Sequence, residues 1–93
     1  MASAGTAMRE VVVENTLGVH ARPATMLAKK AKEFEANIYI DFGSDTADLA
    51  SMMSTLMLAA TKDSRLVIRA EGAEAEAAVD AIAALFAAKF DEE

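Results

Sequence analysis

The spacing of hydrophobic residues predicts short strands that alternate with amphipathic helices. Residues 9–14 (REVVVE) are rich in valine, which is typical of a strand. Residues 37–42 (NIYIDF) and 65–70 (RLVIRA) alternate hydrophobic and polar side chains, so both predict half-buried strands. Residues 46–49 follow a Gly-Ser-Asp turn and predict a short returning strand.

Three other segments, residues 21–35, 51–60 and 74–90, place hydrophobic residues at helical spacing. The last of them is rich in alanine, with acids in its first turn and Lys89 in its last, which suits the helix dipole. The positions expected to face a core are Ala24, Leu27, Ala31 and Phe34 in the first segment, and Ala75, Ala78, Val79, Ile82, Leu85, Phe86 and Phe90 in the last.

The predicted order of elements is therefore β-α-β-β-α-β-α. Three amphipathic helices need one surface to cover, and a four-stranded sheet supplies it. We predict a two-layer α+β domain with the helices on one face of the sheet. Residues 8–90 would form this domain, between a flexible tail of residues 1–7 and an acidic tail of residues 91–93.

Composition narrows the class of protein. The 93 residues suffice for one domain with one core. Cysteine is absent, which argues against a disulfide scaffold and thiolate metal sites and fits a reducing compartment. Residues 1–8 have no apolar core, so we do not expect them to act as a signal peptide, and no apolar run comes near the roughly 18 residues that a membrane span needs. We expect a cytoplasmic protein without membrane insertion.

The charge is unevenly distributed over the chain. The net charge of −6 argues against general binding to nucleic acid. Residues 20–32 nevertheless contain Arg22, Lys29, Lys30 and Lys32 and no acid, whereas residues 71–93 contain seven acids and one lysine. This distribution describes either an ordinary solvated surface or a positive patch around His20 that suits an anion.

The single histidine, His20, lies where a glycine-containing loop ends and the first predicted helix begins. Pro23 supports this helix start, because proline is tolerated in the first turn, where its missing N–H is not needed. His20 would then lie at or beside the N-cap, next to unpaired amide groups and the positive end of the helix dipole. Such a helix end binds anions, and phosphate suits it best.

An imidazole at that position suggests phosphoryl transfer. A neutral ring nitrogen can attack phosphorus to form a phosphohistidine, and backbone amides at Ala21 and Arg22 can hold the phosphoryl oxygens. The Arg22 guanidinium can add charge-assisted hydrogen bonds. The alternative is that His20 merely caps the helix while Arg22 is solvated. A metal site and a hydrolase are disfavoured, because His20 has no clustered ligands and no Ser or Cys partner nearby.

The string Gly-Val-His-Ala-Arg-Pro-Ala at residues 18–24 resembles the active-site signature of HPr, the histidine-containing phosphocarrier family of the bacterial phosphotransferase system. The resemblance covers residues 8–90 and implies an open-faced β-sandwich with an antiparallel sheet. It implies that His20 is phosphorylated on Nδ1 and assisted by Arg22. The implied donor is an Enzyme I-type protein, and the implied acceptors are Enzyme II A-type domains.

The resemblance also implies a regulatory serine, which Ser51 matches. Many members of the family have lysine before this serine and glycine three residues after it, where Ala50 and Ser54 stand here. Ser51 is therefore either the substrate of a serine kinase or simply a helix cap. The family docks its partners beside the active site, which implies docking by Thr16, Met52, Met53 and Leu56. Met52 and Met53 are the expected exposed anchors, because Leu56 continues the buried stripe.

Three functions remain open from the sequence. The first is a monomeric phosphocarrier of the sugar phosphotransferase system, which acts without a cofactor or metal and is a carrier rather than an independent enzyme. The second is a paralogue of a nitrogen-related or regulatory branch. The third is an interaction module that is not phosphorylated, against which the presence of both His20 and Arg22 argues.

Overall fold

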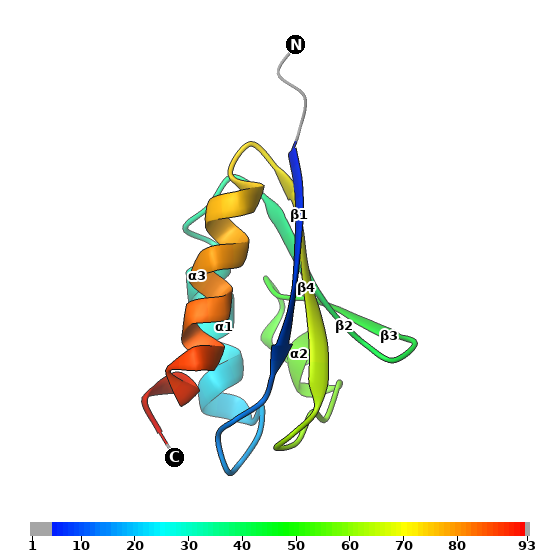
Figure 1. The fold of residues 1–93 in the computed structure, drawn as a ribbon, viewed down its shortest axis with the longest axis vertical. Coiled ribbons are helices and arrows are strands. Elements are labelled where there is room, and N and C mark those ends of the chain that lie inside the picture. Colours follow the sequence, from blue (N-terminus) through cyan, green and yellow to red (C-terminus); the bar gives the residue numbers. More distant parts are fainter. Residues whose placement is uncertain (1–4, 93) are drawn as a thin grey trace.

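A computed structural model describes residues 5–92 and arranges them as an open sandwich of one sheet and a layer of helices (Figure 1). The elements in chain order are β1 (Gly5–Val12), α1 (Ala21–Ala31), β2 (Asn37–Phe42), β3 (Asp45–Asp48), α2 (Met52–Leu56), β4 (Arg65–Gly72), α3 (Ala75–Ala87) and a 3₁₀ turn, η1 (Lys89–Asp91). The predicted α+β class and the β-α-β-β-α-β-α order are confirmed.

The four strands form one antiparallel sheet in the order β1-β4-β2-β3. β4 lies in the middle and pairs with β1 and β2, with Arg9 opposite Ile68 and Ile40 opposite the same residue. β2 and β3 form a hairpin around the Gly43 turn. This order places β1, which leads into His20, beside the strand that follows the α2–β4 connection.

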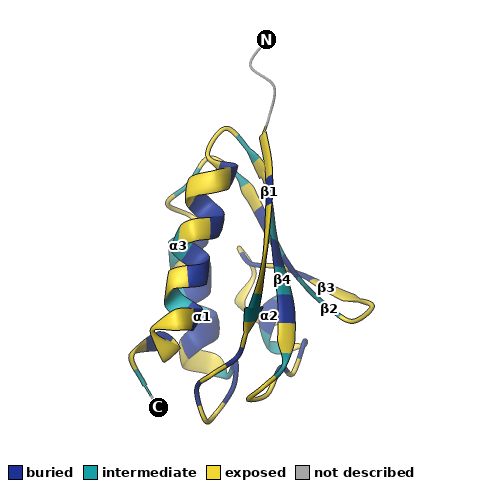
Figure 2. Ribbon diagram, in the orientation of Figure 1, coloured by how far each residue is buried: buried dark blue, intermediate teal, exposed yellow. Residues whose placement is uncertain are grey.

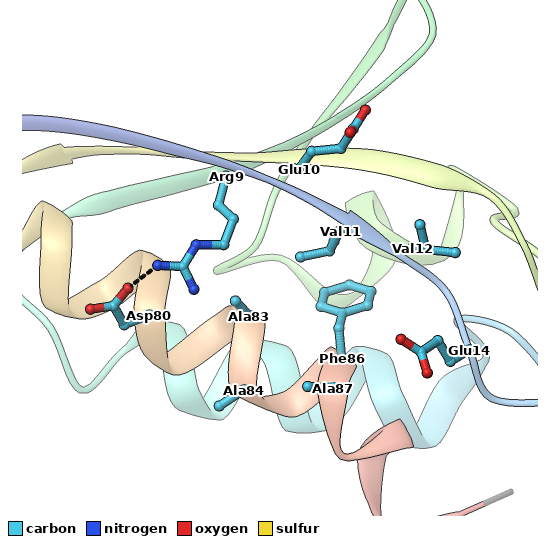
Figure 3. A pocket seen from close by; sticks show the side chains of 10 residues that line it. All are labelled: Arg9, Glu10, Val11, Val12, Glu14, Asp80, Ala83, Ala84, Phe86 and Ala87. Carbon is cyan, nitrogen blue, oxygen red and sulfur yellow. Dashed lines mark hydrogen bonds and ion pairs between the residues drawn. The ribbon is translucent and has the colours of Figure 1, made fainter.

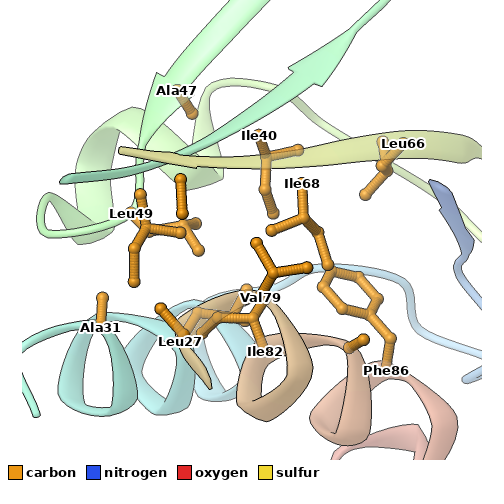
Figure 4. Close-up of a cluster of buried hydrophobic side chains, with 14 of the residues drawn as sticks. Leu27, Ala31, Ile40, Ala47, Leu49, Leu66, Ile68, Val79, Ile82 and Phe86 are labelled. Atoms are coloured by element: carbon orange, nitrogen blue, oxygen red, sulfur yellow. The ribbon is translucent and has the colours of Figure 1, made fainter. Parts of the chain in front are cut away.

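The core lies between the sheet and the helices (Figure 2). Leu27 of α1 and Val79, Ile82 and Phe86 of α3 point toward the inner side chains of β2 and β4 (Figure 4). Most of the helix positions that the spacing assigned to the core are buried, while Phe34 and Leu85 are partly buried. Burial of these side chains stabilises each helix against the sheet by about 1.5–3 kcal/mol per large residue.

The second helix is much shorter than residues 51–60, which the spacing predicted. It ends at Leu56, and Ala59 adopts the left-handed backbone conformation with φ of 53°. The next residue, Ala60, turns its carbonyl oxygen toward the loop before α1, where it accepts a hydrogen bond from the backbone N–H of Val19 at 2.9 Å. The helix therefore ends before the apolar pattern does, because the Ala60 carbonyl is used in this tertiary contact.

The third helix also ends before the predicted residue 90. Lys89, Phe90 and Asp91 all have positive φ, so the chain reverses after Ala88. The reversal buries the Phe90 ring against Phe86, with ring centroids 4.9 Å apart in an edge-to-face arrangement. It also returns Glu92 toward the beginning of α1. Burial of an aromatic ring offsets the left-handed backbone, which costs about 1–2 kcal/mol per residue.

The first strand begins earlier than the sequence indicated. Residues 5–7, which the sequence assigned to a flexible tail, pair with the end of β4, with Gly5 opposite Gly72 and Ala7 opposite Ala70. Pairing with a neighbouring strand outweighs the weak strand propensity of these small residues. Residues 1–4 and 93 lie outside the described residues. The first helix is shorter than predicted, because it ends at Ala31 rather than at residue 35.

The outer face of the sheet carries an ion pair that joins β2 to β4. The Arg69 guanidinium donates to both carboxylate oxygens of Asp41, at 2.6 and 3.1 Å, and lies over the Tyr39 ring at 5.0 Å. The hydrogen bond from Arg69 lowers the pKa of Asp41 below its ordinary value of 3.8, and burial only partly opposes this effect.

The Asp41→Asn change should lower the free energy of unfolding at neutral pH by about 1 kcal/mol. Because the pKa of Asp41 is lowered in the folded state, its contribution is present above pH 3.8 and is lost as the pH falls through the lowered value. Urea denaturation of both proteins at several pH values measures the difference. Glu10→Gln removes a charge from the same face, and an equal pH-dependent loss there would contradict the assignment.

Candidate functional site

His20 is the N-cap of α1, as the sequence predicted. Its backbone is extended, with φ of −95°, and its carbonyl oxygen accepts the first helical bond, from the backbone N–H of Ala24 at 3.0 Å. The His20 side chain makes no capping hydrogen bond to the helix. The backbone N–H groups of Ala21 and Arg22 have no acceptor within the helix, because they belong to its first turn. The imidazole therefore stands beside two free amides and the positive end of the helix.

The loop before His20 is fixed by a close contact with the α2–β4 connection. Gly18 adopts φ of +70°, and a Cβ atom there would lie 2.5 Å from the carbonyl oxygen of Ala60 and 2.9 Å from the Cα of Thr61. Only glycine fits both the conformation and the space. The adjacent hydrogen bond from Val19 to Ala60 holds the two segments together.

The amide of Asn15 braces the same loop from inside. Asn15 is fully buried, and its Nδ2 donates to the carbonyl oxygen of Gly18 at 2.7 Å and to Oε1 of Glu92 at 2.9 Å. Both hydrogen atoms of the amide nitrogen are thus used, one on the loop and one on the segment after α3. Asn15 therefore links the two parts of the chain that meet at His20.

The carboxylate of Glu92 lies at the centre of the site. Its Oε1 lies 2.9 Å from Nε2 of His20, and its Oε2 accepts from the Arg22 guanidinium at 3.2 Å. The side chain of Glu92 is 15% exposed, against 35% for His20 and 55% for Arg22. Three donors from two segments thus converge on one carboxylate, next to the beginning of α1.

These donors change the acidity of Glu92. The hydrogen bond with His20 is the largest cause that lowers its pKa below the ordinary value, followed by the bond from Asn15, and Arg22 adds a smaller electrostatic contribution. A lowered pKa means that the contacts are present at neutral pH and are lost only as the pH falls through that lowered value. The site is therefore built to hold a negative charge.

The lysines that suggested a positive patch around His20 lie elsewhere. Lys29 and Lys30 occupy the last turn of α1, about 14 Å along the helix axis from His20 at 1.5 Å per residue. They face the negative end of the helix dipole, and Lys30 pairs with Glu33. Among these basic residues, Arg22 is the one that contacts the site.

The residues predicted to dock partners lie on the loop before His20 and on α2, and Met52 and Met53 are exposed as expected. Thr16 is exposed, Met53 is 63% exposed and Met52 is 38% exposed, while Leu56 is partly buried. Met52 lies against the first turns of α1, because its sulfur is 3.0 Å from the hydroxyl oxygen of Thr25. Two residues that were not predicted to anchor partners, Leu17 and Met57, are 70% and 80% exposed.

Ser51 caps α2 in the structure. Its hydroxyl oxygen accepts from the backbone N–H of Ser54 at 3.1 Å, and its own carbonyl oxygen accepts from the Thr55 hydroxyl. Helix capping is therefore a sufficient reason for a serine at this position. Ser51 is also exposed, so it lies on the surface beside the methionines.

A groove in the described part of the chain lies away from His20. This groove of about 440 Å³ runs between β1 and α3, and its lining includes the Arg9–Asp80 ion pair and the side chains of Val11, Ala83 and Phe86 (Figure 3). Within residues 5–92, no group of three His, Cys, Asp or Glu side chains is placed to hold a metal ion. None of the helices in the described part of the chain is long and apolar enough to cross a bilayer.

Two residues of the site, Asn15 and Glu92, were not predicted from the sequence. Asn15 stands in a loop that contains glycine, where asparagine commonly serves a turn, so its type gave no specific signal. Glu92 is 72 residues away from His20 and lies among other acids, and only the reversal after α3 brings it to the site. The acidic tail predicted for residues 91–93 thus includes a residue anchored at the site.

Comparisons with known proteins agree with this geometry. A family model described as "PTS HPr component phosphorylation site" matches residues 7–88. That match spans most of the chain, including β1, the loop, His20 and α3. The chain therefore belongs to the HPr family of phosphocarrier proteins.

Individual relatives support the same class. The chain is 46% identical to phosphocarrier protein NPr of Shewanella violacea over 84 residues, which cover 90% of this chain and 92% of that one. It is 35% identical to phosphocarrier protein HPr of Mycoplasma capricolum over 71 residues, which cover 76% and 80%. A crystal structure of HPr from Bacillus anthracis matches with a TM-score of 0.83 and 33% identity, covering 87% and 96%.

The Gly18→Ala change should lower the free energy of unfolding by about 2–3 kcal/mol, because the added methyl group collides with backbone atoms. Gly43→Ala is a matched control, since Gly43 also has positive φ but a Cβ atom there meets nothing within 4 Å. This control should cost only about 1 kcal/mol of backbone strain. Denaturant unfolding of both variants tests the contact, and equal losses would show that it is not tight.

Proposed function

We propose that this protein carries a phosphoryl group on His20, accepting it from an Enzyme I-type donor and passing it to an Enzyme II A-type acceptor. The observation that carries the proposal is the imidazole at the N-cap of α1, beside two unpaired amides and Arg22. Such a helix end favours a dianion. The phosphorylation site named in the matching family model supports the same role.

In the proposed reaction, a neutral ring nitrogen of His20 attacks the donor's phosphorus in line. The N–P bond forms as the bond from phosphorus to the donor atom breaks, and the donor keeps that electron pair. The backbone N–H groups of Ala21 and Arg22 and the Arg22 guanidinium hold the phosphoryl oxygens. Transfer to the acceptor is the same displacement in reverse, so the carrier is restored unchanged.

The partners would dock on the exposed surface formed by Thr16, Leu17, Met52, Met53 and Met57. These side chains lie on the loop before His20 and on α2, next to the first turns of α1. Flexible methionine side chains adapt to unlike partners, which suits a carrier that must bind and release several proteins. Leu56, which is partly buried, would support this surface from below.

Two branches of phosphotransfer are candidates for this carrier. The sugar branch remains the first expectation from the signature around His20. A second candidate, the nitrogen-related branch, is favoured by the name NPr on the relative that is 46% identical, compared with 35% for the relative named HPr. A panel of acceptor proteins from both branches distinguishes them, because only the true acceptor removes the phosphoryl group rapidly.

The protein would act in the cytoplasm as a monomer, so that one face serves donor and acceptors in turn. A serine kinase acting on Ser51 would add a dianion to the cap of α2, beside Met52 and Met53. A charge at that place would weaken apolar docking. The exposed position of Ser51 is compatible with phosphorylation. Its capping bond also accounts for a serine at this position if no phosphorylation occurs.

His20→Ala should fold normally and gain no phosphoryl group when incubated with phosphoenolpyruvate and Enzyme I. The wild type should gain one acid-labile phosphoryl group, detected by mass spectrometry. Arg22→Ala should still be labelled but more slowly, with the free energy of unfolding changed by about 0.5 kcal/mol or less, since its side chain is exposed. Labelling of the His20→Ala protein would refute the proposal.

Met53→Ser should weaken the apparent affinity for the donor about fivefold, which corresponds to about 1 kcal/mol of lost apolar contact. Met8→Ser is the control, because Met8 is 66% exposed but lies on β1, on the outer face of the sheet. Rates of labelling at varied donor concentration give the affinity of each variant. Equal effects at both positions would place the docking surface elsewhere.

A further inference from the structure

The contact between His20 and Glu92 determines which ring nitrogen is free. A carboxylate can only accept hydrogen bonds, so the 2.9 Å contact requires that Nε2 carries the hydrogen atom. In the neutral ring the other nitrogen, Nδ1, then holds the lone pair. The His20 side chain makes no capping bond to the helix, so this lone pair is not used by the first-turn amides.

Glu92 is itself held in one position by groups other than the histidine. Nδ2 of the fully buried Asn15 binds its Oε1, and Arg22 binds its Oε2. The reversal at Lys89–Asp91 and the buried Phe90 ring fix the backbone from which Glu92 extends. The carboxylate is therefore an anchored acceptor and not a mobile surface group.

We propose that Glu92 is a positioning residue for the phosphoryl transfer: it holds the His20 ring in the Nε2–H tautomer and so presents Nδ1 as the nucleophile. This inference rests on the proposed function. A carboxylate that orients a histidine in this way is a common arrangement around reactive imidazoles, where it also stabilises the positive charge that forms on the ring. Here it would be supplied from the far end of the chain.

The group transfer balances with the Nε2 hydrogen retained. The Nδ1 lone pair forms the bond to phosphorus, and the donor atom keeps the electrons of the bond that breaks. The ring becomes positively charged, with Nε2–H still donating to Glu92. Arg22, which lies 3.2 Å from Oε2 of Glu92, can then turn its guanidinium toward the incoming phosphoryl oxygens. Glu92 touches neither phosphorus nor the donor, so its effect acts through the ring.

The test compares the wild type, Glu92→Ala and the control Asp91→Asn. Asp91 is the exposed neighbour of Glu92, and asparagine tolerates its positive φ of 59°. Nitrogen-15 spectra of the His20 ring, at a pH where it is neutral, report the tautomer without any phosphorylation. Labelling by phosphorylated Enzyme I at varied donor concentration separates the maximal rate from the apparent affinity.

Glu92→Ala should convert the ring spectrum from one tautomer to a mixture and lower the maximal labelling rate about tenfold, with the affinity for the donor unchanged. Asp91→Asn should match the wild type in both measurements. Unchanged nitrogen shifts, or an unchanged or faster rate in Glu92→Ala, would overturn the inference, and a faster rate would make Glu92 a competitor of the phosphoryl group. Failure of the wild type to be labelled would instead refute the proposed function, while the ring spectra would still decide the tautomer.

Discussion

The site depends on the contact that holds the loop before α1 against the connection between α2 and β4. The hydrogen bond from Val19 to Ala60 and the close approach of Gly18 to the same carbonyl fix where the loop ends. Because the helix begins immediately afterwards, this contact also fixes the direction in which the first-turn amides point. The short α2, the glycine at position 18 and the buried Asn15 all serve this junction.

Charge at the junction follows from the same geometry. The positive end of α1 and the Arg22 guanidinium suit an anion, and in the structure Arg22 pairs with the Glu92 carboxylate, which also binds Nε2 of His20. A carboxylate and a phosphoryl group present similar oxygens, so the Arg22 guanidinium, which pairs with Glu92, is also suited to the phosphoryl group. The lowered pKa of Glu92 expresses this preference for negative charge.

The architecture could be predicted well from the sequence, because the signals that specify its strands and helices are local. Alternation in residues 37–42 and helical spacing around Leu27 and Ile82 follow directly from which side chains face the core. Proline at position 23 and the preceding glycine located the beginning of α1, and with it His20. These signals depend on neighbouring residues, and they were sufficient to place the histidine at the beginning of a helix.

Other features arise from long-range contacts and could not be predicted from local patterns. The apolar pattern continues to Ala60, yet α2 ends at Leu56, and the left-handed backbone at Ala59 precedes the Ala60 carbonyl that bonds to the loop. The contact of Glu92 with Asn15 and His20 depends on the left-handed turn at residues 89–91, which the alanine-rich pattern does not reveal. The lysines of α1 follow His20 within ten residues of the sequence, but they lie at the opposite end of the helix.

We propose above all that the first-turn amides of α1 hold the phosphoryl group on His20. Backbone amide spectra of the nitrogen-15-labelled protein, recorded before and after phosphorylation, test it directly. We predict that the Ala21 and Arg22 amide resonances undergo the largest shifts, in the direction expected for a new charged acceptor. Unchanged Ala21 and Arg22 resonances in a fully phosphorylated protein would contradict it.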